Sequence, residues 1–415
     1  MKKLTLFILV LSCFEVFGQY TLEFFADTNQ SFVSTDLNFQ FGSNAINNKF
    51  FKSYYLGEYI DEELKATVKD KLKANNYFGG DLNINLLLKL KADTLFNRTD
   101  LYYLFGMEQH QHTNGSFSED AFNLTFYGNK MYAGKDADIS GLELYSFTYQ
   151  AINFGLMKET RKNGVLAQEG FLFSIIKGQQ NTSFLLTKGN LFTDEFGQFI
   201  DLDAQYFYNS SDTAQTGLSA FNGWGIATDL FTVIPFRKND VLKVSIEDIG
   251  FINWNKNSIE VTGDTTYHFE GVEITNLFNL NDSLLNQLSK DSIVDNLNAT
   301  NKKRKYAMSL PTAISLSYYK NLKFNNYLLA SIRYQINTSY RPFFALGYRR
   351  YLSDNIAFQT VANYGGYEKL GVGFGFSVHT NNGYYLNLQT NHLEAFFIPQ
   401  NSFGINGVIN LAKTF

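Results

Sequence analysis

Long segments in which large apolar residues alternate with small or polar residues recur along the chain. Between Leu310 and Phe415 there are about seven of them, each about ten to fourteen residues long, separated by short turn signals. The side chains of a β-strand alternate between its two faces, so each segment predicts a strand with one apolar face. Strands of soluble proteins are usually about five or six residues long, whereas tilted strands of about ten residues cross a membrane. The pattern therefore favours a membrane-spanning β-barrel.

The other face of these segments supports the same interpretation. It carries Gly, Ser, Asn, Gln and Tyr, which is typical of a barrel lumen rather than of a sheet facing bulk water. The chain has 41 Phe, 26 Tyr and 31 Gly but only 4 Pro, a composition that suits strands and turns. The mean hydropathy of −0.19 is too low for a bundle of membrane helices.

We therefore predict an all-β fold, a transmembrane antiparallel β-barrel. Similar segments upstream bring the expected strand number to about 14, within a range of about 12–16. The number should be even, with both termini at the periplasmic end. The barrel is expected to occupy residues 81–415, with a long extracellular insertion at residues 256–305.

The first residues predict an export signal at residues 1–18. A basic start, "MKK", is followed by an apolar run too short to span a bilayer, and small residues at Val16 and Gly18 precede a cleavage point. Cleavage after Gly18 would leave Gln19 first. An alternative is a lipid on Cys13, in "VLSC". Because Cys13 is the only cysteine, cleavage at Gly18 would leave no disulfide and no thiolate metal site.

Residues 19–80 are predicted to form an N-terminal plug or periplasmic cap. A helix is expected near residues 60–75, where Ile60, Leu64, Val68 and Leu72 recur every four residues. A helix within a loop is the alternative. A second short helix is predicted inside the extracellular insertion, after Asp282.

Residues that could form a metal site or a catalytic site are scarce. His110 and His112 lie on one face of a predicted strand, a spacing that can hold a metal, but two ligands are too few and we interpret the pair as solvated at the rim. In "VSIEDIGF", Glu247 and Asp248 fall on opposite faces, so one must reach a rim, a bulge or the lumen. No catalytic, metal or cofactor site is predicted, and the net charge of −4 gives no reason to expect nucleic acid.

Two stretches resemble a family of uncharacterised outer-membrane barrels from Bacteroidetes-type bacteria. The match runs from about Asn75 to the end of the chain. The barrels of this family are also distantly similar to long-chain fatty-acid transporter barrels, which implies fourteen strands and an N-terminal plug. The matching positions are Gly128, Asn129, Gly134, Ser140, Gly141, Tyr149 and Gly155 in the first stretch, and Asp248, Gly250 and Trp254 in the second.

The resemblance also implies an outer-membrane location, with lipid around the barrel. In exported barrels of this kind, the barrel-assembly machinery reads the last strand and its terminal aromatic residue. The residues expected to form that signal are Phe403, Ile405, Ile409, Leu411 and Phe415.

Three functions remain open from the sequence. The first is a channel or transporter for small hydrophobic or amphiphilic molecules, which predicts an apolar pocket or a lateral opening near the plug. The second is a structural or docking barrel of a secretion or envelope complex, which predicts a sealed lumen and a protein partner. The third, a barrel enzyme with a polar cluster at the outer rim, is not expected.

Overall fold

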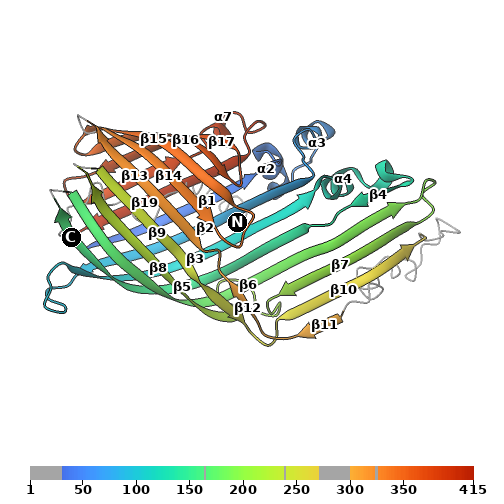
Figure 1. Ribbon diagram of the computed structural model, residues 1–415, viewed down its shortest axis with the longest axis horizontal. Coiled ribbons are helices and arrows are strands. Elements are labelled where there is room, and N and C mark those ends of the chain that lie inside the picture. Colours follow the sequence, from blue (N-terminus) through green and yellow to red (C-terminus); the bar gives the residue numbers. More distant parts are fainter. Residues whose placement is uncertain (1–29, 163–164, 238–239, 271–299, 323–325) are drawn as a thin grey trace.

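Fourteen antiparallel strands close into a barrel in the computed structural model, which describes residues 30–162, 165–237, 240–270, 300–322 and 326–415 (Figure 1). Each strand pairs with the next around the ring, and the last pairs with the first. The predicted fold and strand number are confirmed. In ring order the strands are β1 (Phe32–Ser43), β2 (Asn75–Lys91), β3 (Leu101–Ser118), β5 (Leu142–Lys162), β6 (Val165–Thr193), β8 (Gly223–Phe236), β9 (Asp240–Trp254), β13 (Ala313–Leu322), β14 (Asn326–Gln335), β15 (Arg341–Ser353), β16 (Ile356–Gly366), β17 (Leu370–His379), β18 (Tyr384–Thr390) and β19 (Gly404–Thr414).

Closure brings the first and last strands side by side. Phe32 is paired with Thr414, so β1 begins where β19 ends, and both strand ends lie at one end of the barrel. This end is called the terminal end below, and the other end is called the helical end. An even number of strands requires this arrangement, because each strand reverses the direction of the one before.

The two faces of each strand follow the alternation in the sequence. In β2, Leu82, Ile84 and Leu86 point outward, and Ile84 is 45% exposed, whereas Asp81 and Asn85 point into the lumen. In β19 the apolar set lies outside and the small or polar set is buried. A continuous apolar exterior is what hydrocarbon lipid requires of a barrel wall. Within the described residues, no helix has both the length and the hydrophobicity needed to span a membrane.

One strand extends far beyond the barrel. Strand β6 has 29 residues; its first part pairs with β5 and β8, and its second part pairs with β7 (Ile200–Ser210). Strands β10 (Ile259–Phe269) and β11 (Thr300–Lys303) continue from β7, and β4 (Lys135–Asp138) pairs with the same part of β6. This sheet extension projects away from the end of the barrel at which β19 finishes (Figure 1). A further strand, β12 (Tyr306–Ser309), pairs with the end of β9.

The sheet extension contains most of the described part of the predicted insertion, residues 256–305. The insertion follows β9 at the helical end, and its extracellular position stays a prediction. The helix expected after Asp282 lies outside the described residues.

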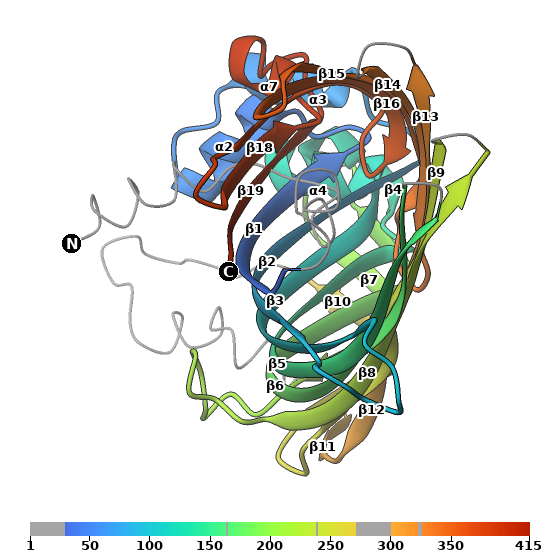
Figure 2. The same cartoon turned by 90° about the vertical axis from the view of Figure 1, so that its left-hand side faces the viewer.

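Within the described residues, the helices lie at the helical end. They are α2 (Asn48–Leu56), α3 (Glu62–Lys69), α4 (Glu119–Tyr127), the 3-10 helix η2 (Asn129–Tyr132) and α7 (Glu394–Phe397) (Figure 2). Asn47 and Asp61 cap α2 and α3 by accepting hydrogen bonds from the backbone N–H groups of Phe50 and Leu64. Apolar side chains of α2, α3 and α4 pack together over the end of β3.

The helix predicted near residues 60–75 is present as α3, but the boundaries predicted for the N-terminal segment were wrong. Residues 32–43 are not part of a plug: they form β1, the first strand of the wall. Helices α2 and α3 then connect β1 to β2 at the helical end, and the barrel begins at Phe32 rather than at residue 81. The physical signal for β1 was present in its sequence, because Leu37, Phe39 and Phe41 alternate with polar residues.

Candidate functional site

A cavity of about 110 Å³ lies inside the barrel, with room for several water molecules. Its lining comes from β1, β2, β3 and β5 on one side and from β9, β13 and β14, with the segment before β13, on the other. Many of the lining residues are polar or charged, and four large apolar or aromatic ones lie among them. The lining residues are Asp36, Asn38, Gln40, Asp81, Asn83, Asn85, His110, His112, Phe147, Tyr149, Lys243, Ser245, Glu247, Asp248, Leu310, Pro311, Ser315, Ser317, Tyr319, Arg333 and Gln335.

Two histidines and an aspartate meet at the wall of this cavity. His110 and His112 are two apart on β3 and therefore share its inward face, and the β2–β3 register pairs His112 with Asp81. Asp81 Oδ1 lies 2.6 Å from His112 Nδ1 and 3.3 Å from His110 Nε2. We call these three residues the histidine cluster.

The outer nitrogen of each histidine has its own partner. His110 Nδ1 lies 3.2 Å from Glu108 Oε1, and the Asn83 amide donates to that same carboxylate oxygen at 2.7 Å. His112 Nε2 lies 2.9 Å from the Asn114 amide nitrogen. These contacts hold both rings in orientations that turn the remaining nitrogen of each toward Asp81.

The histidine cluster was not predicted, and the interpretation of His110 and His112 as a solvated rim pair was wrong. His112 is fully buried within the lumen. The alternation of β3 already placed both histidines on one face. What could not be read from the sequence was the β2–β3 register, which brings Asp81 opposite them.

A bulge in the wall places two further acidic residues at the cavity. The β8–β9 ladder slips between Thr228 and Leu230, leaving Asp229 opposite Glu247 and Asp248. Asp248 has a positive φ of 59°, which is typical of a bulge and uncommon for a residue other than glycine. Glu247 and Asp248 consequently both line the cavity, in agreement with the predicted need for a bulge or a lumen position.

Tyr149 connects the two walls. Its hydroxyl donates a hydrogen bond to Asp248 Oδ1 at 3.1 Å and lies 3.4 Å from His110 Nδ1. The Asp248 backbone N–H donates to Asp229 Oδ1 at 2.8 Å. The histidine cluster on β2 and β3 is therefore linked through β5 to the bulge on β8 and β9.

Carboxylates outnumber cationic side chains around this part of the lumen. Glu247 forms an ion pair with Arg333 at 3.0 Å, and the same guanidinium donates to the Ser315 hydroxyl. Among the described residues here, the acidic groups are Asp36, Asp81, Glu108, Asp229, Glu247 and Asp248, and the basic groups besides histidine are Lys243 and Arg333. The cavity is thus chemically suited to cations and hydrogen-bond donors.

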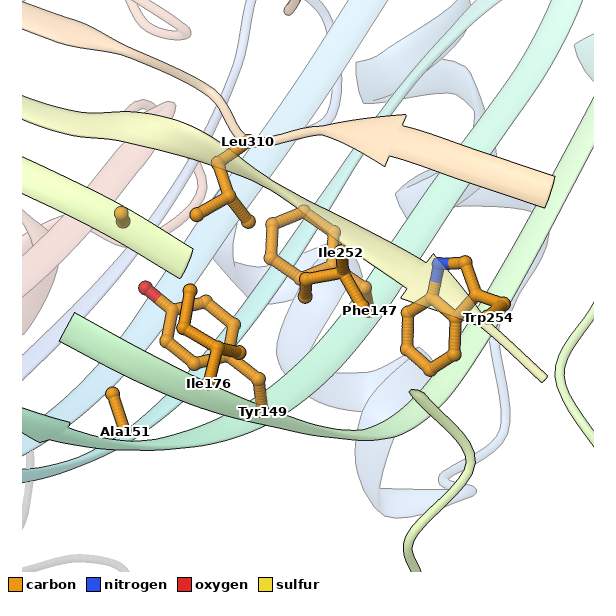
Figure 3. Packing of buried hydrophobic residues seen from close by; sticks show 8 residues of the cluster. Phe147, Tyr149, Ala151, Ile176, Ile252, Trp254 and Leu310 are labelled. Carbon is orange, nitrogen blue, oxygen red and sulfur yellow. The ribbon is translucent and has the colours of Figure 1, made fainter. Parts of the chain in front are cut away.

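One edge of the cavity is apolar. Phe147, Tyr149 and Leu310 belong to a buried cluster with Ile176, Ile252 and Trp254 (Figure 3). Phe147, Ile252, Trp254 and Leu310 are all at most 1% exposed. The Tyr149 and Phe147 rings also lie beside those of His110 and His112, with centroids 5.1 Å and 5.2 Å apart. A molecule in the cavity would therefore meet charged groups and a packed aromatic and aliphatic surface next to each other.

The sequence matches a family described as a family of unknown function (DUF5723) over residues 28–385. The chain belongs to this family. The family match begins at residue 28, whereas the resemblance was expected to begin at about Asn75. The match therefore includes the whole of β1. Comparison with curated proteins gives no match.

Several solved barrels are similar to the chain in three dimensions. A deltaS2S3 mutant of TodX, a monoaromatic hydrocarbon channel, is 9% identical with a TM-score of 0.47, over 95% of this chain and 92% of that one. The toluene transporter TodX from P. putida is 11% identical with a TM-score of 0.43 and the same coverage. A Pseudomonas aeruginosa FadL homologue is 9% identical with a TM-score of 0.40, over 93% of this chain and 90% of that one.

The positions on which the resemblance to this family rests lie in three parts of the structure. Tyr149 and Asp248 are hydrogen-bonded to each other at the cavity, and Trp254 lies in the adjoining apolar cluster. Gly155 and Gly250 lie in the wall, where a Cβ atom would come within 2.0 Å and 2.2 Å of a neighbouring carbonyl oxygen. The other positions surround α4, η2 and β4 at the helical end: Gly128, Asn129, Gly134, Ser140 and Gly141.

The positions predicted to act as an assembly signal occupy the last strand and its flanks. Ile405, Ile409 and Leu411 lie on the outward face of β19, and Phe415 follows the strand at the terminal end with 63% exposure. Phe403 precedes the strand at the helical end. Recognition of these residues by the barrel-assembly machinery stays a prediction. Gly18 and Gln19 lie outside the described residues.

A buried histidine bridges two loops at the helical end. His392 donates from Nε2 to Glu368 at 3.0 Å and from Nδ1 to Glu394 at 2.8 Å, so both ring nitrogens carry protons. Burial by itself lowers the pKa of His392, but the hydrogen bond and charge of Glu368, together with those of Glu394, outweigh it and raise the pKa to about 9.

The raised pKa predicts a loss of stability in mildly alkaline solution. A group whose pKa is higher in the folded state contributes its full stabilisation below its unfolded pKa and loses it as the pH rises through the folded pKa. The contribution of His392 should therefore decline from about pH 6.5 to about pH 9. Urea unfolding at a series of pH values should show this decline, and His392→Gln should remove it. An identical pH profile in the variant would contradict the prediction.

Proposed function

We propose that the protein is an outer-membrane transport barrel for small amphiphilic molecules. The observation that carries the proposal is the mixed lining of the luminal cavity, in which carboxylates and histidines lie close to the apolar and aromatic side chains of Phe147, Tyr149 and Leu310. A site with a few convergent polar groups and an apolar surface is typical of small-molecule binding. The polar group of a substrate would lie by the carboxylates of the cavity, and its apolar part against Phe147, Tyr149 and Leu310.

The chemistry of the cavity narrows the class of substrate. A pocket that binds a hydrocarbon is expected to be entirely apolar. The lining of this cavity instead contains charged and amide groups. Leaving such groups without hydrogen-bond partners is costly, so a purely apolar substrate would be disfavoured there. An amphiphile with a cationic or hydrogen-bond-donating group fits the excess of carboxylates better.

The outer-membrane location is part of the same proposal. It is supported by the predicted export signal and by the apolar exterior of the barrel. In this orientation the terminal end faces the periplasm, and the helices and the sheet extension face outward from the cell. Lipid is then the partner of the barrel wall.

The proposal is tested by filling the cavity without changing the wall. Ser317 on β13 lines the cavity, and its neighbour Leu316 faces outward with 42% exposure. In reconstituted vesicles, Ser317→Trp should lower the flux of an amphiphilic amine several-fold, because the new indole occupies the lumen. Leu316→Trp should leave the flux unchanged, because a tryptophan is accommodated on the lipid side. Equal flux through both variants would contradict transport by way of this cavity.

A docking role is the second candidate, and the sheet extension favours it. The extension and its loops expose large apolar side chains: Phe207 on β7 is 50% exposed, and Phe196 in the β6–β7 loop is 81% exposed. Exposed apolar surface on a chain already seated in a membrane is a common basis for partner binding. If vesicles carrying the unmodified protein show no flux above empty vesicles, this docking role becomes the better proposal.

A further inference from the structure

We propose that Asp81, His110 and His112 form a binding site for a divalent transition-metal ion of the zinc type inside the barrel. One carboxylate oxygen and two imidazole nitrogens converge there from two neighbouring strands. These are the ligands that zinc and similar ions take from proteins. The site does not depend on the proposed transport function, because a metal could equally stabilise a barrel that serves as a dock.

The distances between the ligand atoms are close to those that a metal requires. The ligand atoms of the three residues all lie within 4.8 Å of one another. Around a tetrahedral zinc ion with bonds of about 2.0–2.1 Å, neighbouring ligand atoms are about 3.3 Å apart. Asp81 Oδ1 and His110 Nε2 are already 3.3 Å apart, and Asp81 Oδ1 and His112 Nδ1 would separate slightly from 2.6 Å. Small side-chain adjustments would therefore be sufficient.

The partners of the outer nitrogens provide the second reason. Metal-bound histidines usually donate their other N–H group to a carboxylate or amide, which fixes the tautomer and the ring orientation. His110 Nδ1 faces the Glu108 carboxylate at 3.2 Å, which leaves Nε2 for the metal. His112 Nε2 faces the Asn114 amide, which can present its oxygen by rotating, so that Nδ1 is left for the metal.

The surrounding charge provides the third reason. Asp81 and Glu108 both face the histidines, and Asp248 is linked to His110 through the Tyr149 hydroxyl. A divalent cation would offset this concentration of carboxylates in a site shielded from bulk water. Three protein ligands leave a further coordination position, and all three residues line the cavity. The rival explanation is a hydrogen-bonded network of the same residues without a metal.

The experiment measures cobalt and zinc binding to the folded, full-length barrel in detergent after treatment with a chelator. We expect about one equivalent of Co²⁺ per chain with visible absorption bands of nitrogen and oxygen coordination, displaced by Zn²⁺. His112→Gln and Asp81→Asn should each weaken binding at least about 100-fold. The matched control is His379→Gln, at the end of β17 outside the cavity, which should bind like the unmodified protein.

Folding of each variant is checked by the shift between heated and unheated samples in gel electrophoresis, which reports a closed barrel. If His112→Gln does not fold, Glu108→Gln replaces it, because this change keeps the shape of the side chain and should weaken binding about 10–100-fold. The proposal is overturned if the unmodified protein binds no cobalt. It is also overturned if the folded cluster variants bind as tightly as His379→Gln, because the metal would then lie elsewhere.

Discussion

Replacing Glu159 with leucine is expected to destabilise the barrel by about 3–5 kcal/mol, the usual result of removing one partner of a buried ion pair. Glu159 on β5 and Lys89 on β2 are both nearly inaccessible to solvent, and their charged atoms are 2.7 Å apart. The Gln168 amide also donates to the Glu159 carboxylate. Without that carboxylate, the Lys89 ammonium would remain in an apolar cluster that contains Tyr102 and Phe32.

The control for this prediction removes both charges of the ion pair. The double variant Lys89→Met with Glu159→Leu should recover most of the lost stability, because replacing a buried ion pair with apolar groups of similar volume is often neutral or stabilising. The free energy of unfolding in urea is measured in lipid vesicles for the unmodified protein, the single variant and the double variant. If the single and double variants have the same stability, the pair is solvated in the lumen and the prediction fails.

Replacing Leu346 with arginine is expected to cost about 2–4 kcal/mol, because the new charge would face hydrocarbon near the middle of the bilayer. Leu346 lies near the centre of β15, faces outward and is 68% exposed. The measurement is again the free energy of unfolding in vesicles. The result tests the membrane-spanning interpretation directly, since an arginine at an exposed position of a water-facing sheet usually changes stability very little.

Leu352 supplies the matched control. It lies on the same strand and the same outward face, six positions further along, and is 59% exposed, but it is next to the turn at the terminal end. Leu352→Arg should therefore cost only about 0–1 kcal/mol, as for charges near the membrane interface. Equal costs at the two positions would mean that depth has no influence, and the assignment of this face to lipid would be wrong.

The wall of the barrel could be predicted because its information is local. Strand period, strand length and the contrast between two faces are properties of short segments, such as Ile405, Ile409 and Leu411 in β19. Even the placement of Glu247 and Asp248 was foreseeable, because two consecutive acidic residues cannot both face the lumen in a regular strand. The helix α3 was found from its apolar period for the same reason.

The segment before α3 was predicted incorrectly although its signal was local too. Strand β1 alternates like the others, but it is separated from the next strand by the helical segment that contains α3. Its pairing with both β19 and β2 makes it part of the wall.

The sequence alone determined that this chain forms a barrel and which residues of its later strands face outward. Only the tertiary structure decided that Asp81 meets His110 and His112, that Tyr149 reaches Asp248, and that the second part of β6 continues beyond the barrel. The reason is physical. Alternation specifies the face of a strand, whereas contacts across strands depend on register, bulges and closure, which are set by the whole ring of strands together.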